Sequence, residues 1–122
     1  MIKELTDKNY NQIVNDTNSF IFVLFKAPMC SPCMEAEDIL ELLDIYFSKK
    51  DIVFYKCDIS KNQKIAKKYE IDYVPFTILI DKEKKIRIPN NGLSNIDSYI
   101  KSIESVISTK KSIFYKIFRR EK

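Results

Sequence analysis

Apolar residues gather in three short runs, which cover residues 20–25, 52–57 and 75–80. The runs are rich in aromatic and β-branched side chains, and continuous runs of this kind are typical of strands that are covered on both faces of a sheet. A segment with helical spacing joins the first run to the second. We therefore expect these two strands to be parallel and joined by a right-handed crossover.

Other segments repeat their apolar residues at intervals of three and four, which predicts amphipathic helices on either side of the runs. The expected helices are one from a cap at Thr6 or Asp7 to about residue 15, one over 35–47, one from a cap at Ser60 to about residue 69, and one from a cap at Ser94 through Ile107. Two short strands complete the pattern. They should cover residues 2–5 and 85–88, the second of them antiparallel and reached through a hairpin turn at 81–84.

The composition places the chain among ordinary globular proteins. It has 122 residues, of which 45% are hydrophobic and 31% charged, and this balance suits one folded domain and excludes disorder. The first residues lack the apolar stretch of a signal peptide, and no apolar run approaches the length that spans a bilayer. A cytoplasmic location and a monomer are the expectations.

Positive charge is concentrated at the C-terminus. The net charge is +4, yet residues 110–122 alone carry +5. We therefore divide the chain into a domain over 1–109 and a basic aromatic tail over 110–122, and we expect no nucleic-acid partner. The tail interleaves cations with apolar residues, so three roles stay open: docking onto the domain as an extension of the last helix, weak contact with a membrane surface or an acidic partner, and disorder.

Cys30 and Cys33 carry the candidate chemistry. Two cysteines three apart at a helix start have Cα atoms about 5 to 6 Å apart, which is within the range of a disulfide. The unpaired backbone N–H groups at that end favour a thiolate. Cys30 should be the more acidic and exposed thiol and Cys33 the more buried one, while Pro32 suits the first helical turn.

Other interpretations of the pair compete with redox exchange. A closed zinc site needs four ligands, and because the chain has no histidine, Cys57 is the one further thiolate that it offers. An idle pair on a degenerate fold is the second alternative. Cys57 itself is expected to be a small core residue, with a regulatory or dimer-forming thiol as the minority view.

Four features, in this order along residues 2–107, resemble the thioredoxin family. They are the apolar strand at 20–25, Cys30-Ser31-Pro32-Cys33 against the family's Cys-Gly-Pro-Cys, Val74-Pro75 followed by Thr77 against its cis-proline turn, and Gly92 against its late glycine. The resemblance implies a thioredoxin fold: three α/β/α layers around a mixed sheet of four to five strands.

The resemblance also implies an activity, the reduction of protein disulfides through the dithiol. Cys30 would attack the substrate disulfide and Cys33 would then resolve the mixed disulfide. Pro75 would follow a cis peptide bond, and Val74 and Gly92 would contact the substrate. Electrons would come from a thioredoxin reductase or a similar donor, with no bound cofactor and no metal.

Departures from the family pattern surround the cysteines. Met29 replaces the usual tryptophan and Ser31 the usual glycine, and both are expected to support the site together with Pro32. Leu24 stands where the family typically has a buried aspartate, and the lysine that usually pairs with it is kept as Lys56. Lys56 is expected to support the site by favouring a thiolate, and the alternative is a solvated residue at a strand end. We therefore expect an active pair whose resolving step depends more strongly on pH.

Carboxylates follow the cysteine pair in the sequence. They are Glu35, Glu37 and Asp38, and the helix dipole accounts for carboxylates at such positions.

The alternative to the enzyme is an adaptor, which would hold a partner through the proline groove or the tail with little turnover.

Overall fold

A computed structural model of the chain describes residues 2–88 and 95–120, and in the last helix it describes side chains as far as residue 108. Helices and strands alternate along the chain. In order they are β1 (Lys3–Glu4), α1 (Tyr10–Asp16), β2 (Phe20–Lys26), α2 (Ser31–Tyr46), β3 (Ile52–Asp58), α3 (Gln63–Lys68), β4 (Phe76–Ile80), β5 (Ile86–Arg87) and α4 (Ile96–Arg120).

The strands form one mixed sheet in the order β1-β3-β2-β4-β5. β2 pairs parallel with β3 and antiparallel with β4, so it occupies the centre of the sheet. This is the strand predicted from the first apolar run, and every residue from Phe20 to Phe25 is buried. The parallel pairing of the first two runs is confirmed, as is the antiparallel hairpin from β4 to β5.

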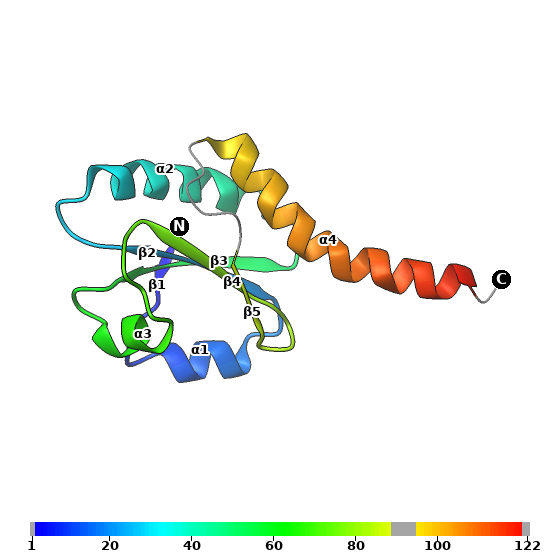
Figure 1. Cartoon of the computed structure of the whole chain (residues 1–122), viewed down its shortest axis with the longest axis horizontal. Coiled ribbons are helices and arrows are strands. Elements are labelled where there is room, and N and C mark those ends of the chain that lie inside the picture. Colours follow the sequence, from blue (N-terminus) through cyan, green and yellow to red (C-terminus); the bar gives the residue numbers. More distant parts are fainter. Residues whose placement is uncertain (1, 89–94, 121–122) are drawn as a thin grey trace.

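Helices cover both faces of the sheet and give the predicted three-layer α/β/α architecture. α2 and α4 lie on one face, and α1 and α3 lie on the other (Figure 1). Each side has its own core, because alternate residues of a strand point to opposite faces. Leu24 packs on the side of α2 and α4, whereas Phe25 and Cys57 pack on the side of α1 and α3.

One predicted helix cap is confirmed in part and another is wrong. The side chain of Thr6 accepts a hydrogen bond from the N–H of Asn9, and the Thr6 N–H donates to the Asn9 side chain, which is the reciprocal pattern of a capping box, although the regular helix α1 begins only at Tyr10. Asp7 accepts hydrogen bonds from the backbone N–H groups of Lys64 and Ile65, and it therefore caps α3 instead. α3 in turn starts at Gln63 and not after Ser60.

The helix that follows the cysteines begins earlier than its apolar pattern indicated. The spacing starts at residue 35, but α2 starts at Ser31, with Cys30 as its N-cap residue and Pro32 in its first turn. Ser31 and Pro32 are exposed and belong to no apolar stripe, whereas Cys33 continues the buried stripe of Ala36, Leu40 and Leu43 into the first turn. Both cysteines consequently belong to the helix start itself.

The last helix continues across the predicted boundary at residue 109. α4 is helical from Ile96 to Arg120, and its C-terminal half extends beyond the sheet (Figure 1). The cap predicted at Ser94 lies outside the described residues, and the separation of a tail stays a prediction. Over the part of the chain that is described, no helix is both long and apolar enough to span a membrane.

Candidate functional site

Cys30 and Cys33 lie at the start of α2, just after the turn that connects it to β2. β2 ends at Lys26, and a short turn with Met29 in the left-handed backbone region (φ 57°) leads into the helix. A disulfide joins the two cysteines, whose Cα atoms are 5.2 Å apart. This distance agrees with the one expected from their spacing in the sequence.

The helix start surrounds Cys30 with hydrogen-bond donors. Its Sγ accepts a hydrogen bond from the backbone N–H of Cys33 at 3.2 Å, and its carbonyl accepts one from the N–H of Met34 at 3.2 Å. Sulfur at an N-cap position lies at the positive end of the helix dipole. Because an anion gains most from this position, the reduced form of Cys30 is favoured as a thiolate.

The two thiols differ in access as the sequence predicted. Cys33 is 1% exposed beneath the first turn of α2, whereas Cys30 is partly exposed. Ser31 and Pro32 between them are exposed, and Met29 extends fully into solvent. A disulfide partner can therefore reach Cys30 from outside, whereas Cys33 is covered.

Pro75 lies at the same end of the sheet as the cysteine pair. The Val74–Pro75 peptide bond is cis, as predicted, and β4 starts at the next residue. Phe76 pairs with Phe25 of the antiparallel neighbour β2, so the start of β4 lies beside the end of β2. Both Val74 and Pro75 are partly buried there. Gly92, the third residue predicted to contact substrate, lies outside the described residues.

Lys56 has a partner that the sequence did not indicate. Its Nζ lies 3.3 Å from Oε1 of Glu37, and Nζ of Lys26 lies 3.5 Å from Oε2 of the same carboxylate. Leu24, which pairs with Lys56 across β2 and β3, is 1% exposed. Glu37 is thus favoured by the helix dipole and also forms ion pairs with both lysines. Its spacing of four from Cys33 was the available signal, because it places both residues on one face of α2.

Cys57 is apart from this chemistry. It is fully buried on the opposite side of the sheet, as expected for a core residue. Burial raises the pKa of its thiol to about 12, and the negative charges of Asp7, Asp58 and Glu4 add to the effect. Within the described residues, no three His, Cys, Asp or Glu side chains come together as a metal site.

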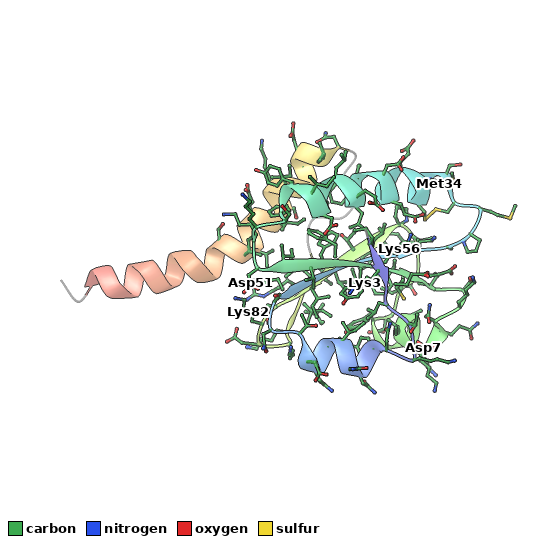
Figure 2. The ribbon with its side chains drawn as sticks, turned by 180° about the vertical axis from the view of Figure 1, so that it is seen from behind. Lys3, Asp7, Met34, Asp51, Lys56 and Lys82 are labelled. Carbon is green, nitrogen blue, oxygen red and sulfur yellow. A yellow bond between two sulfur atoms is a disulfide. The ribbon has the colours of Figure 1, made fainter. Side chains whose placement is uncertain are left out.

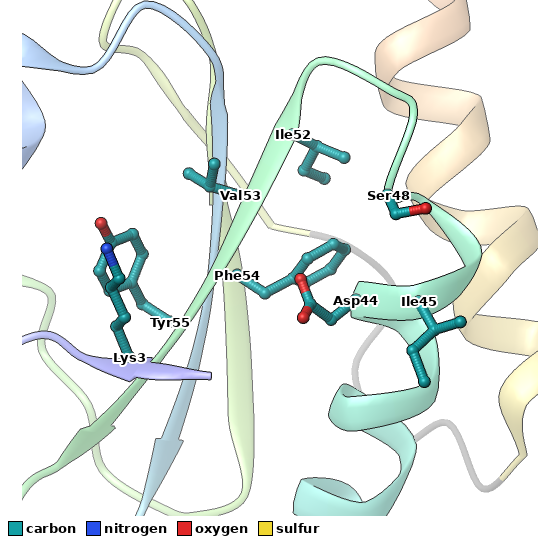
Figure 3. Close-up of a pocket in the computed structure, with 8 residues that line it drawn as sticks. All are labelled: Lys3, Asp44, Ile45, Ser48, Ile52, Val53, Phe54 and Tyr55. Carbon is teal, nitrogen blue, oxygen red and sulfur yellow. The ribbon is translucent and has the colours of Figure 1, made fainter. Parts of the chain in front are cut away.

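An open groove of about 440 Å³ lies at the other end of α2, against the start of β3 (Figure 3). It is lined by Lys3, Asp44, Ile45, Ser48, Ile52, Val53, Phe54 and Tyr55. These residues come from β1, from β3 and from the C-terminal end of α2 and the turn after it, and none of them is a cysteine. The groove is therefore separate from the redox site.

Comparison with known proteins agrees with the fold and the site. The thioredoxin family model matches residues 1–105. Thioredoxin of Buchnera aphidicola subsp. Schizaphis graminum is 39% identical over 96 residues, which are 78% of this chain and 87% of that protein. Thioredoxin of Chlorobaculum thiosulfatiphilum is 33% identical over 104 residues, covering 80% of this chain and 94% of the relative.

Larger proteins share the same domain. Protein disulfide isomerase-like 2-2 of Oryza sativa subsp. japonica is 29% identical over 104 residues, which are 84% of this chain but 28% of that protein. Fold, paired cysteines and cis-proline occur here in one unit of the size of the bacterial thioredoxins. The chain therefore belongs to the thioredoxin family and is a thiol-disulfide oxidoreductase.

Proposed function

We propose that the protein is a thioredoxin-type reductase of protein disulfides, working in the cytoplasm. The observation that carries the proposal is the hydrogen bond from the Cys33 N–H to the Cys30 Sγ at a helix start that is open to solvent. It supports a nucleophilic thiolate at the accessible cysteine, with the second sulfur within bonding distance behind it.

The reaction follows from the different access of the two sulfurs. The Cys30 thiolate attacks one sulfur of a substrate disulfide, forms a mixed disulfide and releases the first substrate thiolate. Cys33 then loses its proton and attacks the Cys30 sulfur, so that the Cys30–Cys33 disulfide forms and the second substrate thiolate leaves. The substrate gains two electrons from the dithiol. Of the two protons that it takes up, one comes from Cys33 and the other from the solvent that received the Cys30 proton. A thioredoxin reductase or a similar donor restores the dithiol.

The cis-proline turn supports a docking site for the substrate. Val74 lies two residues before β4, at the end of the sheet where Cys30 is accessible, and an extended segment that carries the disulfide would pair with its main chain. Met29, Met34 and Tyr73 expose apolar surface around this end of the molecule. Thioethers adapt to many shapes, so they suit a site that accepts varied protein segments. Gly92 belongs to this proposal on the resemblance alone.

The direction of electron flow is proposed from Pro32. A proline before the second cysteine is the arrangement of the reducing members of the family. We expect a reduction potential nearer to thioredoxin, at about −270 mV, than to an oxidant such as DsbA, at about −120 mV. Equilibration with glutathione buffers of graded composition measures the potential. A value near the oxidant would contradict the direction but leave the exchange chemistry in place.

Turnover decides between this proposal and an adaptor. Reduction of insulin disulfides by dithiothreitol should be accelerated by the wild-type protein and not by Cys30→Ser. Cys57→Ala is the matched control, since it removes a thiol from the other side of the sheet and should keep the activity. Absence of turnover in the folded wild-type protein would favour the adaptor. A Cys33→Ser variant should accumulate mixed disulfides with its substrates.

A further inference from the structure

Three charged side chains form a compact cluster under the first turns of α2. Glu37 lies between Lys26 and Lys56, with the nitrogen–oxygen distances of 3.5 and 3.3 Å given above. All three are partly buried, with side-chain exposures of 26%, 22% and 28%. We call these residues the Lys26–Glu37–Lys56 cluster. Its net charge is +1, because two ammonium groups face one carboxylate.

The cluster lies on the same side of the sheet as Cys33. Leu24 packs in the core under α2, and Lys56 is its direct partner on β3, while Lys26 is two residues further along β2. Alternation along the strands places Leu24, Lys26 and Lys56 on one face. Figure 2 shows Lys56 near the end of α2 that carries Met34. Glu37 follows Cys33 by one helical turn, so their Cβ atoms are about 6 Å apart.

We propose that Glu37 sets the acidity and the reduction potential of the cysteine pair by cancelling half of the positive charge that Lys26 and Lys56 place beside it. A nearby cation stabilises the thiolate form of the dithiol but does little for the neutral disulfide. Two uncompensated ammonium groups would therefore shift the pair toward the dithiol and make it a weaker reductant. The carboxylate of Glu37 opposes that shift. Leu24 has no charge and cannot do so.

Other charged groups occur at this end of the molecule. They are Glu35 on α2, Asp58 at the end of β3 and Asp72 in the segment before the cis-proline. Burial acts to raise the pKa of the Asp58 carboxyl, but hydrogen bonds from Ser60 and the positive charges of Lys26 and Lys61 hold it below the usual value. These groups stay in place in every variant considered below, so they shift all of the measurements alike.

Substitutions that change the charge of the cluster test the proposal. Glu37→Gln raises its net charge to +2, and Lys56→Met lowers it to zero. In glutathione buffer above the pKa of the Cys30 thiol, Glu37→Gln should shift the equilibrium toward the dithiol by about three- to tenfold, or about 15 to 30 mV. Lys56→Met should shift it toward the disulfide by a similar factor. The rate of Cys30 alkylation against pH should show the pKa moving in the matching directions.

The double variant is the most discriminating test of an effect of net charge. Glu37→Gln with Lys56→Met leaves Lys26 alone and restores the net charge of +1, so its equilibrium should return to within about twofold of wild type. Asp38→Asn is the matched control, because it removes a carboxylate from an exposed position in the same helix turn. Circular dichroism checks that each variant is folded. If Glu37→Gln does not fold, the shift measured for Lys56→Met still tests the proposal.

Two results would overturn the proposal. In one, all cluster variants stay within twofold of wild type. In the other, Glu37→Gln slows release from the mixed disulfide at low pH with its potential unchanged, which would make Glu37 a proton acceptor. The inference rests on the proposed dithiol function, yet the two fail separately. A high wild-type potential contradicts the reductase, whereas absence of shifts between variants contradicts the role of Glu37.

Discussion

At the scale of single residues, burial separates Cys57 from the two cysteines at the helix start. Cys57 is fully buried, and its pKa is raised to about 12 from an ordinary value of 9.0. The folded protein thus holds the thiol proton at a pH where the unfolded chain has lost it. The stabilisation from this difference is complete below pH 9 and is lost as the pH rises from there toward 12.

Comparison with Cys57→Ala measures this contribution. The free energy of unfolding of the wild type should fall relative to the variant by about 1.4 kcal/mol per pH unit over that alkaline range. Urea denaturation at a series of pH values gives the difference. Burial also raises the pKa of Tyr69 and Tyr99, but both tyrosines remain in the variant and their effect cancels. Parallel pH curves would contradict a buried neutral thiol.

The residues of the site were predictable to different degrees. The pairing of Cys30 with Cys33 and the cis peptide at Pro75 depend on neighbours in the sequence or on a family pattern, and the structure contains both. Glu37 was not recognised because its partners, Lys26 and Lys56, are 11 and 19 residues away and come from two different strands. Only the register of β2 and β3 brings these lysines together.

At the scale of elements, strands were easier to predict than helix starts. Continuous apolar runs mark strands of a covered sheet wherever their partners lie, so β2, β3 and β4 appeared close to their final bounds. A cap, by contrast, is a single hydrogen-bonding side chain. The cap of α3 comes from Asp7, which is 57 and 58 residues before the N–H groups that it binds. The local sequence favoured Ser60 because serine is a common cap residue, and a contact with the distant Asp7 cannot be detected from local sequence.

Asp7 should therefore matter to an element that is far from it in sequence. Asp7→Ala leaves the first N–H groups of α3 without their carboxylate, and loss of a cap costs about 1 kcal/mol. Urea unfolding should show this decrease in stability, and amide exchange at Lys64 and Ile65 should become faster. Asp16→Ala, at the exposed end of α1, is the control and should change stability by less than about 0.5 kcal/mol. Equal effects of both substitutions would contradict a specific cap.

At the scale of the whole molecule, the C-terminal half of α4 differs from the rest of the chain in its charge and its position. The helix packs on the core through Tyr99 and Ile103, with Val106 and Ile107 as the last residues that contact this core cluster among the described side chains. The family match ends at residue 105, and beyond it the helix extends past the sheet (Figure 1). The positive charge of the chain is concentrated in the same stretch, where residues 110–122 carry +5.

Truncation after Ser108 distinguishes the roles of this segment. We expect the melting temperature and the disulfide-exchange activity to be retained, because among the described side chains the residues packed on the core end at Ile107. Binding to anionic vesicles should be lost, since interleaved cations and apolar residues suit a negatively charged bilayer surface. Co-sedimentation with phosphatidylserine vesicles measures binding, and vesicles of phosphatidylcholine alone are the control. Because the attraction is electrostatic, added salt should weaken it. A lower melting temperature after truncation would instead show that the segment docks on the domain.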